Sequence, residues 1–265
     1  KTKHVLWQNI LEHYKLNFMS IYKLVSGILL INFFLGFSQD ESTATEIWSP
    51  IPVKINASDF NVAPSDAIIL FDGKDFSNWV TQYSNEIPKW KINSDGSMTV
   101  INGTGGIKTI ESYGSVQLHV EWKTSKGIRN KKPQYNSNSG VFLQQQYELQ
   151  ILDSYENPTY VNGQAGAIYK QHSPMVNSSK KPGEWQSYDV IFNSPVFDKK
   201  KLIKPAFFTV FQNGVLIQNH VEVQGATTNV GLPKYNSHGN LPLVLQDHPS
   251  LPLSFRNIWI RKIAD

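Results

Sequence analysis

Carboxylate and amide side chains occupy alternate positions in residues 139–154, SGVFLQQQYELQILDS. Glu148 and Gln150 alternate there with Leu149 and Ile151. Successive strand residues point to opposite faces of a sheet, so the apolar pair would pack into a core while the polar pair lines the other face. A carboxylate in such a place can remove a proton, hold a metal ion or bind hydroxyl groups. We interpret this stretch as the floor of a site.

A second alternating stretch, residues 115–123 (SVQLHVEWK), presents His119 and Glu121 on its polar face. If this strand lies beside residues 147–152 in one sheet, these two side chains converge with the acid and the amide described above. Imidazole and carboxylate ligands suit several divalent metals, so His119, Glu121 and Glu148 together would also hold an ion, although spacing alone does not establish one. The alternative is an ordinary solvent-facing sheet surface, for which alternation is equally typical.

Other candidate site residues lie in shorter motifs. Asp189 closes the run GEWQSYD (183–189), and the pair Asp247-His248 follows a predicted strand. An Asp-His pair in a loop can orient an imidazole for proton transfer, or simply close a turn. Aromatic rings can stack on sugars, although most aromatic residues of a sandwich are core. The aromatic candidates are Tyr147, Tyr155, Tyr169, Trp185 and Trp259.

Short strands separated by Gly, Asn and Pro turns must position these residues. After residue 38 no segment has a long helical period, which favours an all-β sandwich or barrel. The pair Asn213-Gly214 supplies the positive φ angles of a type I′ hairpin turn. The predicted strands are Ile68–Phe71, Trp90–Ile92, Met98–Ile101, Ser115–Lys123, Gly140–Leu143, Tyr147–Leu152, Ala165–Tyr169, Gln186–Asn193, Phe207–Gln212, Val215–Gln218, Leu243–Gln246 and Phe255–Arg261.

The N-terminal part has the form of a secretory signal peptide. From Met19, a short basic start leads into an apolar run at 24–37, with cleavage predicted after Ser38. The run is shorter than the about 20 apolar residues of a membrane span, so no stable span is expected after cleavage; an uncleaved anchor is the alternative. The predicted organisation is an upstream extension outside the fold (1–18), a signal peptide (19–38), a linker or N-terminal arm (39–65) and one β-sandwich domain (66–265).

The positive charge of the chain is concentrated in this leader. Of the net charge of +4 over 265 residues, residues 1–38 carry +3, which leaves +1 for the rest. A nearly neutral domain is not expected to bind nucleic acid. Cysteine is absent, which excludes disulfides, thiol nucleophiles and the lipid-modified cysteine of a bacterial lipoprotein. We therefore expect a periplasmic or secreted protein.

Eight short motifs occur in an order that resembles the DUF1080 family, also called the 3-keto-disaccharide hydrolase domain. Each motif is weak alone, but together, in register over about residues 67–263, they are specific. The resemblance implies a concanavalin A-like, jelly-roll sandwich of two antiparallel sheets in an exported bacterial protein. The motifs are LFDGKDFSNW (70–79), NSGVFL (138–143), YELQILD (147–153), GAIY (166–169), GEWQSYDV (183–190), NGV (213–215), LQDH (245–248) and FRNIWIR (255–261).

The resemblance further implies a carbohydrate substrate, a glycoside whose glucose ring an upstream sugar 3-dehydrogenase has oxidised at C3. The ketone acidifies the C2 proton, so a base removes it, the C1 oxygen leaves by elimination, and water adds to the unsaturated sugar. No cofactor is required for these steps, although the participation of a divalent metal ion is left open. For these steps we assign Glu148 as the base, which the motif match favours, with His119 and Glu121 as further catalytic candidates. The implied substrate-binding residues are Gln150, Asp153, Tyr169, Trp185, Asp189, His248 and Arg256.

Two basic insertions depart from the simplest family pattern, residues 127–135 and 194–205, and we expect them to shape the mouth of the groove. Three other functions stay open. A retaining glycosidase needs two carboxylates about 5–5.5 Å apart, whereas Glu148 and Asp153 lie on opposite faces by parity. A non-catalytic, lectin-like module needs the groove but no base. A structural or adhesive surface domain would have a closed or apolar groove.

Overall fold

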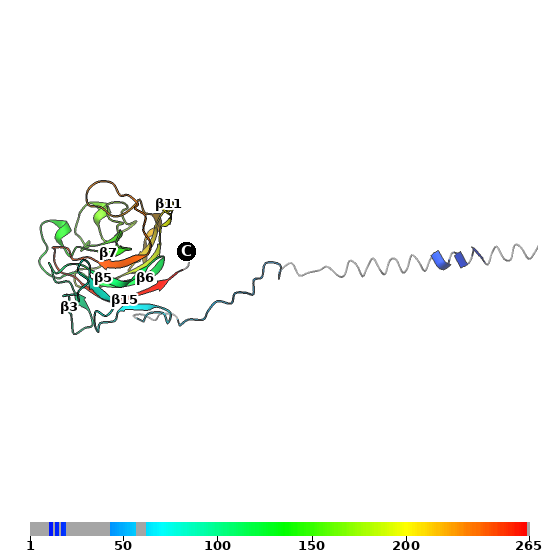
Figure 1. The fold of residues 1–265 in the computed structure, drawn as a ribbon, viewed down its shortest axis with the longest axis horizontal. Coiled ribbons are helices and arrows are strands. Elements are labelled where there is room, and N and C mark those ends of the chain that lie inside the picture. Colours follow the sequence, from blue (N-terminus) through cyan, green and yellow to red (C-terminus); the bar gives the residue numbers. More distant parts are fainter. Residues whose placement is uncertain (1–10, 13, 16, 20–42, 57–61, 264–265) are drawn as a thin grey trace, which may run out of the picture. The chain divides into compact units, whose positions relative to one another are not determined.

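The structure is a computed structural model that describes residues 11, 12, 14, 15, 17–19, 43–56 and 62–263 (Figure 1). Residues 43–54 are exposed and contain no strand, and the chain from Ile55 onward forms one compact unit. Except for Met19, the predicted signal peptide lies outside the described residues. Within the described ranges, no helix is long and apolar enough to cross a membrane.

Two antiparallel sheets form the β-sandwich, as the sequence predicted (Figure 1). Sheet A has the order β13-β12-β9-β6-β15-β4-β3, with β1 also paired to β15; sheet B has the order β2-β5-β14-β7-β8. Sheet A contains β1 (Ile68–Phe71), β3 (Lys91–Ile92), β4 (Met98–Thr99), β6 (Val116–Lys123), β9 (Trp185–Asn193), β12 (Phe207–Gln212), β13 (Val215–Glu222) and β15 (Ser254–Lys262). Sheet B contains β2 (Trp79–Thr81), β5 (Ile107–Tyr113), β7 (Ser139–Leu143), β8 (Tyr147–Ile151) and β14 (Leu241–Leu245). The remaining elements are the hairpin of β10 (Val196–Asp198) and β11 (Lys201–Lys204), and the short 3-10 helices η2 (Pro133–Tyr135) and η3 (Val161–Gly163).

The core lies between the apolar faces that the alternation predicted. Leu118 on β6 and Leu149 and Ile151 on β8 are completely buried in it. Tyr188 on β9 reaches from sheet A to sheet B, where its hydroxyl donates a hydrogen bond of 2.8 Å to the backbone carbonyl of Gln150. Burial of each large apolar side chain contributes about 1.5–3 kcal/mol, which fixes the inward faces of both strands. The polar faces of β6 and β8 therefore lie on the two opposite outer surfaces of the sandwich.

Most predicted strands are present within one or two residues. The hairpin of β12 and β13 is confirmed, with φ angles of 54° at Asn213 and 79° at Gly214. The strand predicted at 165–169 is wrong, because this segment contains turns and forms isolated bridges at Ile168 rather than a continuous strand. The strands that the sequence analysis missed are β2, β5, β10 and β11.

Candidate active site

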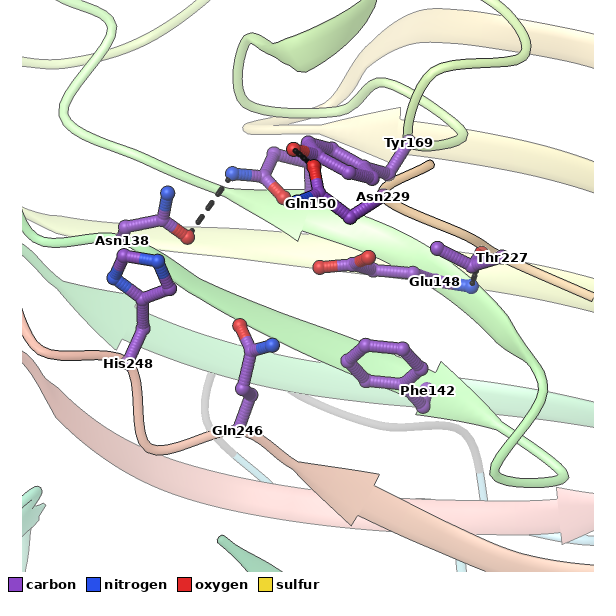
Figure 2. A pocket seen from close by; sticks show the side chains of 9 residues that line it. All are labelled: Asn138, Phe142, Glu148, Gln150, Tyr169, Thr227, Asn229, Gln246 and His248. Carbon is purple, nitrogen blue, oxygen red and sulfur yellow. Dashed lines mark hydrogen bonds between the residues drawn. The ribbon is translucent and has the colours of Figure 1, made fainter. Parts of the chain in front are cut away.

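A pocket of about 330 Å³ opens on the outer face of sheet B, over β7 and β8 (Figure 2). It is lined by Asn138, Phe142, Glu148, Gln150, Tyr169, Thr227, Asn229, Gln246 and His248. All of these side chains except the ring of Phe142 can form hydrogen bonds. The combination suits a ligand that is covered with hydroxyl groups.

Glu148 sits at the centre of this pocket because a neighbouring residue has no side chain. In the pairing of β7 with β8, Phe142 lies opposite Glu148 and Gly140 lies opposite Gln150. A Cβ atom at Gly140 would collide with Oε1 of Glu148 and come within 2.7 Å of Cε2 of Phe142. The carboxyl group therefore rests over the bare backbone of Gly140, beside the ring of Phe142 (Figure 2).

The segment 166–169 completes one wall by running along the edge of β8. The backbone N–H of Tyr169 donates to the carbonyl of Glu148 (3.2 Å), and that of Gln150 donates to the carbonyl of Ala167 (2.9 Å). These bonds satisfy backbone groups that an edge strand would otherwise leave unpaired. They also place the phenol of Tyr169 at the pocket, with its hydroxyl 2.8 Å from that of Tyr160.

The carboxyl group of Glu148 is almost isolated from water and from protein partners. The residue is 4% exposed, and its hydrogen bonds to Thr227 and Tyr169 use its backbone N–H (3.0 Å) and its backbone carbonyl (3.2 Å), whereas its carboxyl group has no hydrogen-bond partner among the described residues. Burial raises the pKa of Glu148 to about 8. A carboxyl group with a pKa near neutrality can both accept and return a proton.

Further polar atoms around Glu148 lack a partner among the described residues. They are Oε1 of Gln150, Oε1 of Gln246 and Nδ1 of His248. Each unpaired buried group costs about 1–3 kcal/mol, so this concentration indicates a surface that a bound ligand completes. Burial lowers the pKa of His248 despite the adjacent Asp247, which keeps the imidazole neutral near pH 7.

Tyr169 is a neutral proton donor in this surrounding. Burial and the hydrogen bond with Tyr160 both raise the pKa of its phenol. Its hydroxyl also lies 3.4 Å from Oδ1 of Asn229, in donor geometry (Figure 2). The phenol therefore keeps its proton at neutral pH and can give it to a more basic oxygen.

The other predicted catalytic residues lie in a different cavity, of about 630 Å³, on the outer face of sheet A. Nδ1 of His119 lies 2.6 Å from Asp189, and its Nε2 lies 3.6 Å from Glu121. Glu121 also accepts hydrogen bonds from Nε of Arg256 (2.6 Å) and Nδ2 of Asn257 (2.8 Å). This cavity lines up five charged or amide groups in one continuous network.

The predicted convergence of His119 and Glu121 with Glu148 and Gln150 is wrong. β6 and β8 belong to different sheets, and the shared core forces their polar faces apart. His119, Glu121 and Glu148 therefore cannot hold one metal ion together. Within the described residues, no group of three or more His, Cys, Asp and Glu side chains has the geometry to hold a metal.

The two cavities differ in their capacity for proton transfer. Burial alone lowers the pKa of His119, but its bonds with Asp189 and Glu121 outweigh burial and raise the pKa to about 9. Burial alone raises the pKa of Glu121, but its bonds with His119, Asn257 and Arg256 lower it to about 2. A paired imidazolium and a paired carboxylate are poor bases at neutral pH. Glu148, unpaired and near neutrality, is the better candidate.

Comparison with known proteins decides the family. Residues 66–261, which include every residue that lines the pocket of Glu148, match the domain described as 3-keto-alpha-glucoside-1,2-lyase-like. The chain belongs to this family. Membership of the 3-keto-alpha-glucoside-1,2-lyase-like family makes the chain a glycan-processing enzyme, and it confirms the predicted relationship.

Solved structures agree with this lyase-like assignment. A "putative glycosyl hydrolase" from Parabacteroides distasonis is 42% identical, with a TM-score of 0.81, and the match covers 86% of this chain and 99% of that one. Two further structures of the same description and organism are 18% and 21% identical, with TM-scores of 0.56 and 0.51. They cover 75% and 74% of this chain and 94% and 99% of their own, and share its concanavalin A-like fold. No curated protein matches the sequence.

The remaining predicted residues of the lyase-like domain divide between the two cavities and the loops. Gln150, Tyr169 and His248 line the pocket of Glu148. Trp185, Asp189 and Arg256 line the cavity on sheet A. Asp153 lines neither and instead forms an ion pair with Arg129, at 2.6 and 2.9 Å. This pair removes Asp153 as the second carboxylate of a retaining glycosidase.

The two basic insertions of the lyase-like domain have different places. The first, 127–135, ends at Tyr135, whose ring lies edge-on against His248 at 5.7 Å, so it borders the pocket of Glu148. The second, 194–205, forms the hairpin of β10 and β11 and lines neither cavity. The prediction that both insertions shape the groove is therefore wrong for the second.

Sequence reasoning missed five pocket residues. Two of them could have been recognised from the family motifs, because Asn138 begins the motif NSGVFL and Gln246 lies within LQDH. The structure ties these motifs together, since the backbone N–H of Gln246 donates to the carbonyl of Gly140 (3.0 Å) and Nε2 of Gln150 donates to Oδ1 of Asn138 (3.2 Å). Phe142 also lies within NSGVFL, whereas no motif marked Thr227 and Asn229.

Proposed function

We propose that this protein cleaves the glycosidic bond of 3-keto-glycosides, with Glu148 as the base. The observation that supports this most is the isolated carboxyl group of Glu148, buried and without a charged partner in a pocket of neutral hydrogen-bonding groups. A 3-keto sugar is uncharged and carries an acidic C–H bond at C2. Both properties match a neutral pocket that holds a single base of raised pKa.

The proposed reaction has two stages. In the first, Glu148 takes the C2 proton, the electron pair of the C2–H bond forms the C1=C2 double bond, and the C1–O bond breaks. The leaving oxygen takes a proton from the phenol of Tyr169. In the second stage, the hydroxyl of water goes to C1, its proton goes to the phenolate of Tyr169, and Glu148 returns its proton to C2, so both side chains regain their starting states. The sum is hydrolysis, and these steps use only side chains and water.

Neutral donors stabilise the enolate that develops at the C3 oxygen in this mechanism. The amide N–H groups of Gln246 and Asn229 border the same pocket, whereas that of Gln150 donates to Asn138 and His248 binds substrate hydroxyl groups. Preorganised hydrogen-bond donors of this kind contribute several kcal/mol to the stabilisation of an anionic transition state. The description of the family as 1,2-lyase-like supports elimination between C1 and C2.

The cellular setting belongs to the same proposal. A substrate with a C3 ketone must come from an enzyme that oxidises the C3 hydroxyl of a glycoside, which is the role of a sugar 3-dehydrogenase. The signal-peptide-like sequence at 19–38 supports export to the periplasm or the medium. No cysteine is present to receive a lipid.

The test is the release of 3-keto-glucose from 3-keto-trehalose and from an alkyl 3-keto-glucoside. We expect wild-type protein to release it and Glu148→Gln to lose at least 100-fold in kcat/KM, while Glu111→Gln, which changes an exposed glutamate on β5, keeps full rate. A substrate deuterated at C2 should show a primary isotope effect on kcat/KM. Full activity of Glu148→Gln would contradict the base assignment, and no release from either substrate would contradict the function.

Elimination and hydration can be separated in the same assay. Unsaturated ketone that accumulates, detected by its ultraviolet absorbance, would show that the enzyme stops as a lyase. Release of 3-keto-glucose without this intermediate would show that both stages occur in the pocket. Binding of intact glycans without any cleavage would favour the lectin-like alternative instead.

A further inference from the structure

The cavity on sheet A has no part in the reaction proposed above, yet it is the larger of the two. Its volume is about 630 Å³, against about 330 Å³ for the pocket of Glu148. The two open on opposite outer surfaces of the sandwich, since one lies over β6, β9 and β15 and the other over β7 and β8. A ligand in one therefore does not touch the other.

A β-bulge builds this cavity. In the register of the two strands, Glu121 pairs with Arg256 and His119 pairs with Trp259. Between these two pairs the chain advances three residues on β15 but only two on β6, so β15 contains one extra residue. The extra residue, Asn257, has a φ of 45°, a left-handed conformation that is uncommon outside glycine. Without the bulge, residues 256 and 259 would point to opposite faces. The bulge places both on the outer face and directs Asn257 onto Glu121.

Two indole rings form the apolar part of the cavity. Trp259 stacks on the imidazole of His119, with ring centroids 5.2 Å apart and planes 12° apart. The guanidinium of Arg256 lies 4.1 Å from the ring centre of Trp185, and Lys123 lies 4.4 Å from it. Cations over indole rings hold these side chains in fixed positions. The indole of Trp185 stays partly exposed and lines the cavity.

Four charged side chains of the cavity are paired with one another, and the fifth, Lys180, donates a hydrogen bond of 3.1 Å to the backbone carbonyl of Trp185. Asp189 binds His119, and Glu121 binds Arg256. An uncharged ligand can bind here without breaking either of these pairs. Hydrogen-bonding capacity is still available, because the Asp189 side chain is 44% exposed and that of Arg256 is 34% exposed. Ser187 adds a hydroxyl at the same surface.

We propose that this cavity is a second carbohydrate site, which binds uncharged pyranose units of an intact glycan and holds the enzyme on it. The part of the Trp185 indole that Arg256 and Lys123 leave uncovered contacts C–H groups of a pyranose, and the paired Asp189 and Arg256 bind its hydroxyl groups by charge-assisted hydrogen bonds. The site needs no ketone and no base. It therefore stands independently of the reaction proposed for Glu148.

The test is affinity electrophoresis of the full chain in gels that contain amylopectin, dextran or barley β-glucan, all uncharged glucans. We expect at least one of them to retard wild type and Glu148→Gln equally. Trp185→Ala and Asp189→Asn should bind at least tenfold more weakly, whereas Trp48→Ala, which removes an exposed indole outside the cavity, should bind as wild type does. Ser187→Trp fills the cavity while leaving Trp185, Asp189 and Arg256 in place, and it should also abolish retardation.

Cleavage of a small soluble 3-keto-glucoside serves as the second readout. All variants of the sheet A cavity should keep kcat/KM within about twofold of wild type, which also shows that they fold. Retardation by none of the three glucans would overturn the proposal. So would Trp185→Ala and Ser187→Trp variants that migrate as wild type, or a Glu148→Gln variant that alone loses retardation. Failure of cleavage in every variant, including wild type, would count against the reaction but not against this site.

Discussion

Glu148 and Gly140 lie diagonally across β7 and β8, and the carboxyl group of the glutamate covers the backbone of the glycine. The position opposite Glu148 is filled by the ring of Phe142, so the carboxyl group has room only over Gly140. The placement of the proposed base thus depends on the absence of a Cβ atom at Gly140, which only glycine provides. This relationship joins two motifs, NSGVFL and YELQILD, that the sequence shows only as separate strands.

Gly140→Ala should displace the base. The new Cβ would collide with Oε1 of Glu148 and lie 2.7 Å from Phe142, so one of the two side chains must move. A shift of about 1 Å in a catalytic group can cost about 100-fold in rate, and we expect a loss of that size in kcat for cleavage of a 3-keto-glucoside. Gly239→Ala is the matched control, because nothing lies within 4 Å of its added Cβ. Equal rates for the two variants would contradict the packing argument.

Cleavage should accelerate as the pH rises toward 8. Burial holds the pKa of Glu148 at about 8, so only a minority of the free enzyme carries the ionised base at pH 7, and that fraction falls tenfold for each further unit of acid. The pH profile of kcat/KM reports the free enzyme and should rise with an apparent pKa near 8. A rising limb centred near 4.5, the ordinary glutamate value, would show that this carboxyl group is not the base.

The same burial should make Glu148 a cost to stability at high pH. Its pKa is about 8 in the folded state against 4.5 as the reference, so the folded protein retains a proton that the unfolded chain releases. Folding is therefore favoured most below pH 4.5, and stability declines as the pH rises through 8. Glu148→Gln should match wild type near pH 5 and exceed it at pH 9 by on the order of a few kcal/mol. The measurement is the melting temperature of the variant and of wild type at these two pH values. If the difference between the two proteins were the same at pH 5 and at pH 9, the prediction would be contradicted.

Alternation predicted which side chains face inward but not which strands share a sheet. Leu149 and Ile151 are fully buried and Glu148 faces away from the core, as parity required. Whether β6 lies beside β8 depends on strand order, and strand order is set by contacts between residues far apart in the chain. The strands of His119 and Glu148 show the same alternation in the sequence, yet their polar faces lie on opposite surfaces of the sandwich.

Local sequence patterns also could not predict that the polar face of β8 is buried. An outward side chain on a sheet is normally solvated, yet Glu148 and Gln150 are only 4% and 1% exposed. The loops that carry Tyr169, Asn229 and His248 cover them, and these loops come from three distant parts of the sequence. The order of the family motifs, rather than the alternation, was the signal that marked this face as a site.

Tyr169→Phe should slow cleavage in a way that depends on the leaving group. The phenol keeps its proton because burial and Tyr160 raise its pKa, and general acids contribute about 10²–10⁴-fold when the leaving oxygen is basic. We expect at least a 100-fold loss of kcat/KM with 3-keto-trehalose. The loss should be much smaller with p-nitrophenyl 3-keto-glucoside, whose leaving group needs no proton. Tyr160→Phe is the control and should lose only severalfold with either substrate. Equal losses with both substrates for Tyr169→Phe would assign the phenol to binding.

Arg129→Ala should destabilise the fold and loosen the pocket together. The side chain of Asp153 is 3% exposed and depends on Arg129 for two hydrogen bonds, so the substitution leaves a buried charge unpaired, at a cost of about 3 kcal/mol. Removal of both charges in Arg129→Ala/Asp153→Asn should recover part of this loss, because no unpaired carboxylate remains. Lys74→Ala, which breaks an exposed ion pair with Asp72, should have a much smaller effect on stability, because solvent screens exposed pairs.

The consequence of Arg129→Ala for catalysis follows from the loop that it anchors. Residues 127–135 connect this ion pair to Tyr135, whose ring packs against His248 at the pocket. A loosened loop leaves Glu148 in place but frees His248, so substrate binding should suffer more than proton abstraction. We expect KM for a 3-keto-glucoside to rise severalfold while kcat falls less than twofold. A fall in kcat at unchanged KM would instead mean that the loop acts on the base, and it would contradict the separation of the two parts of the pocket.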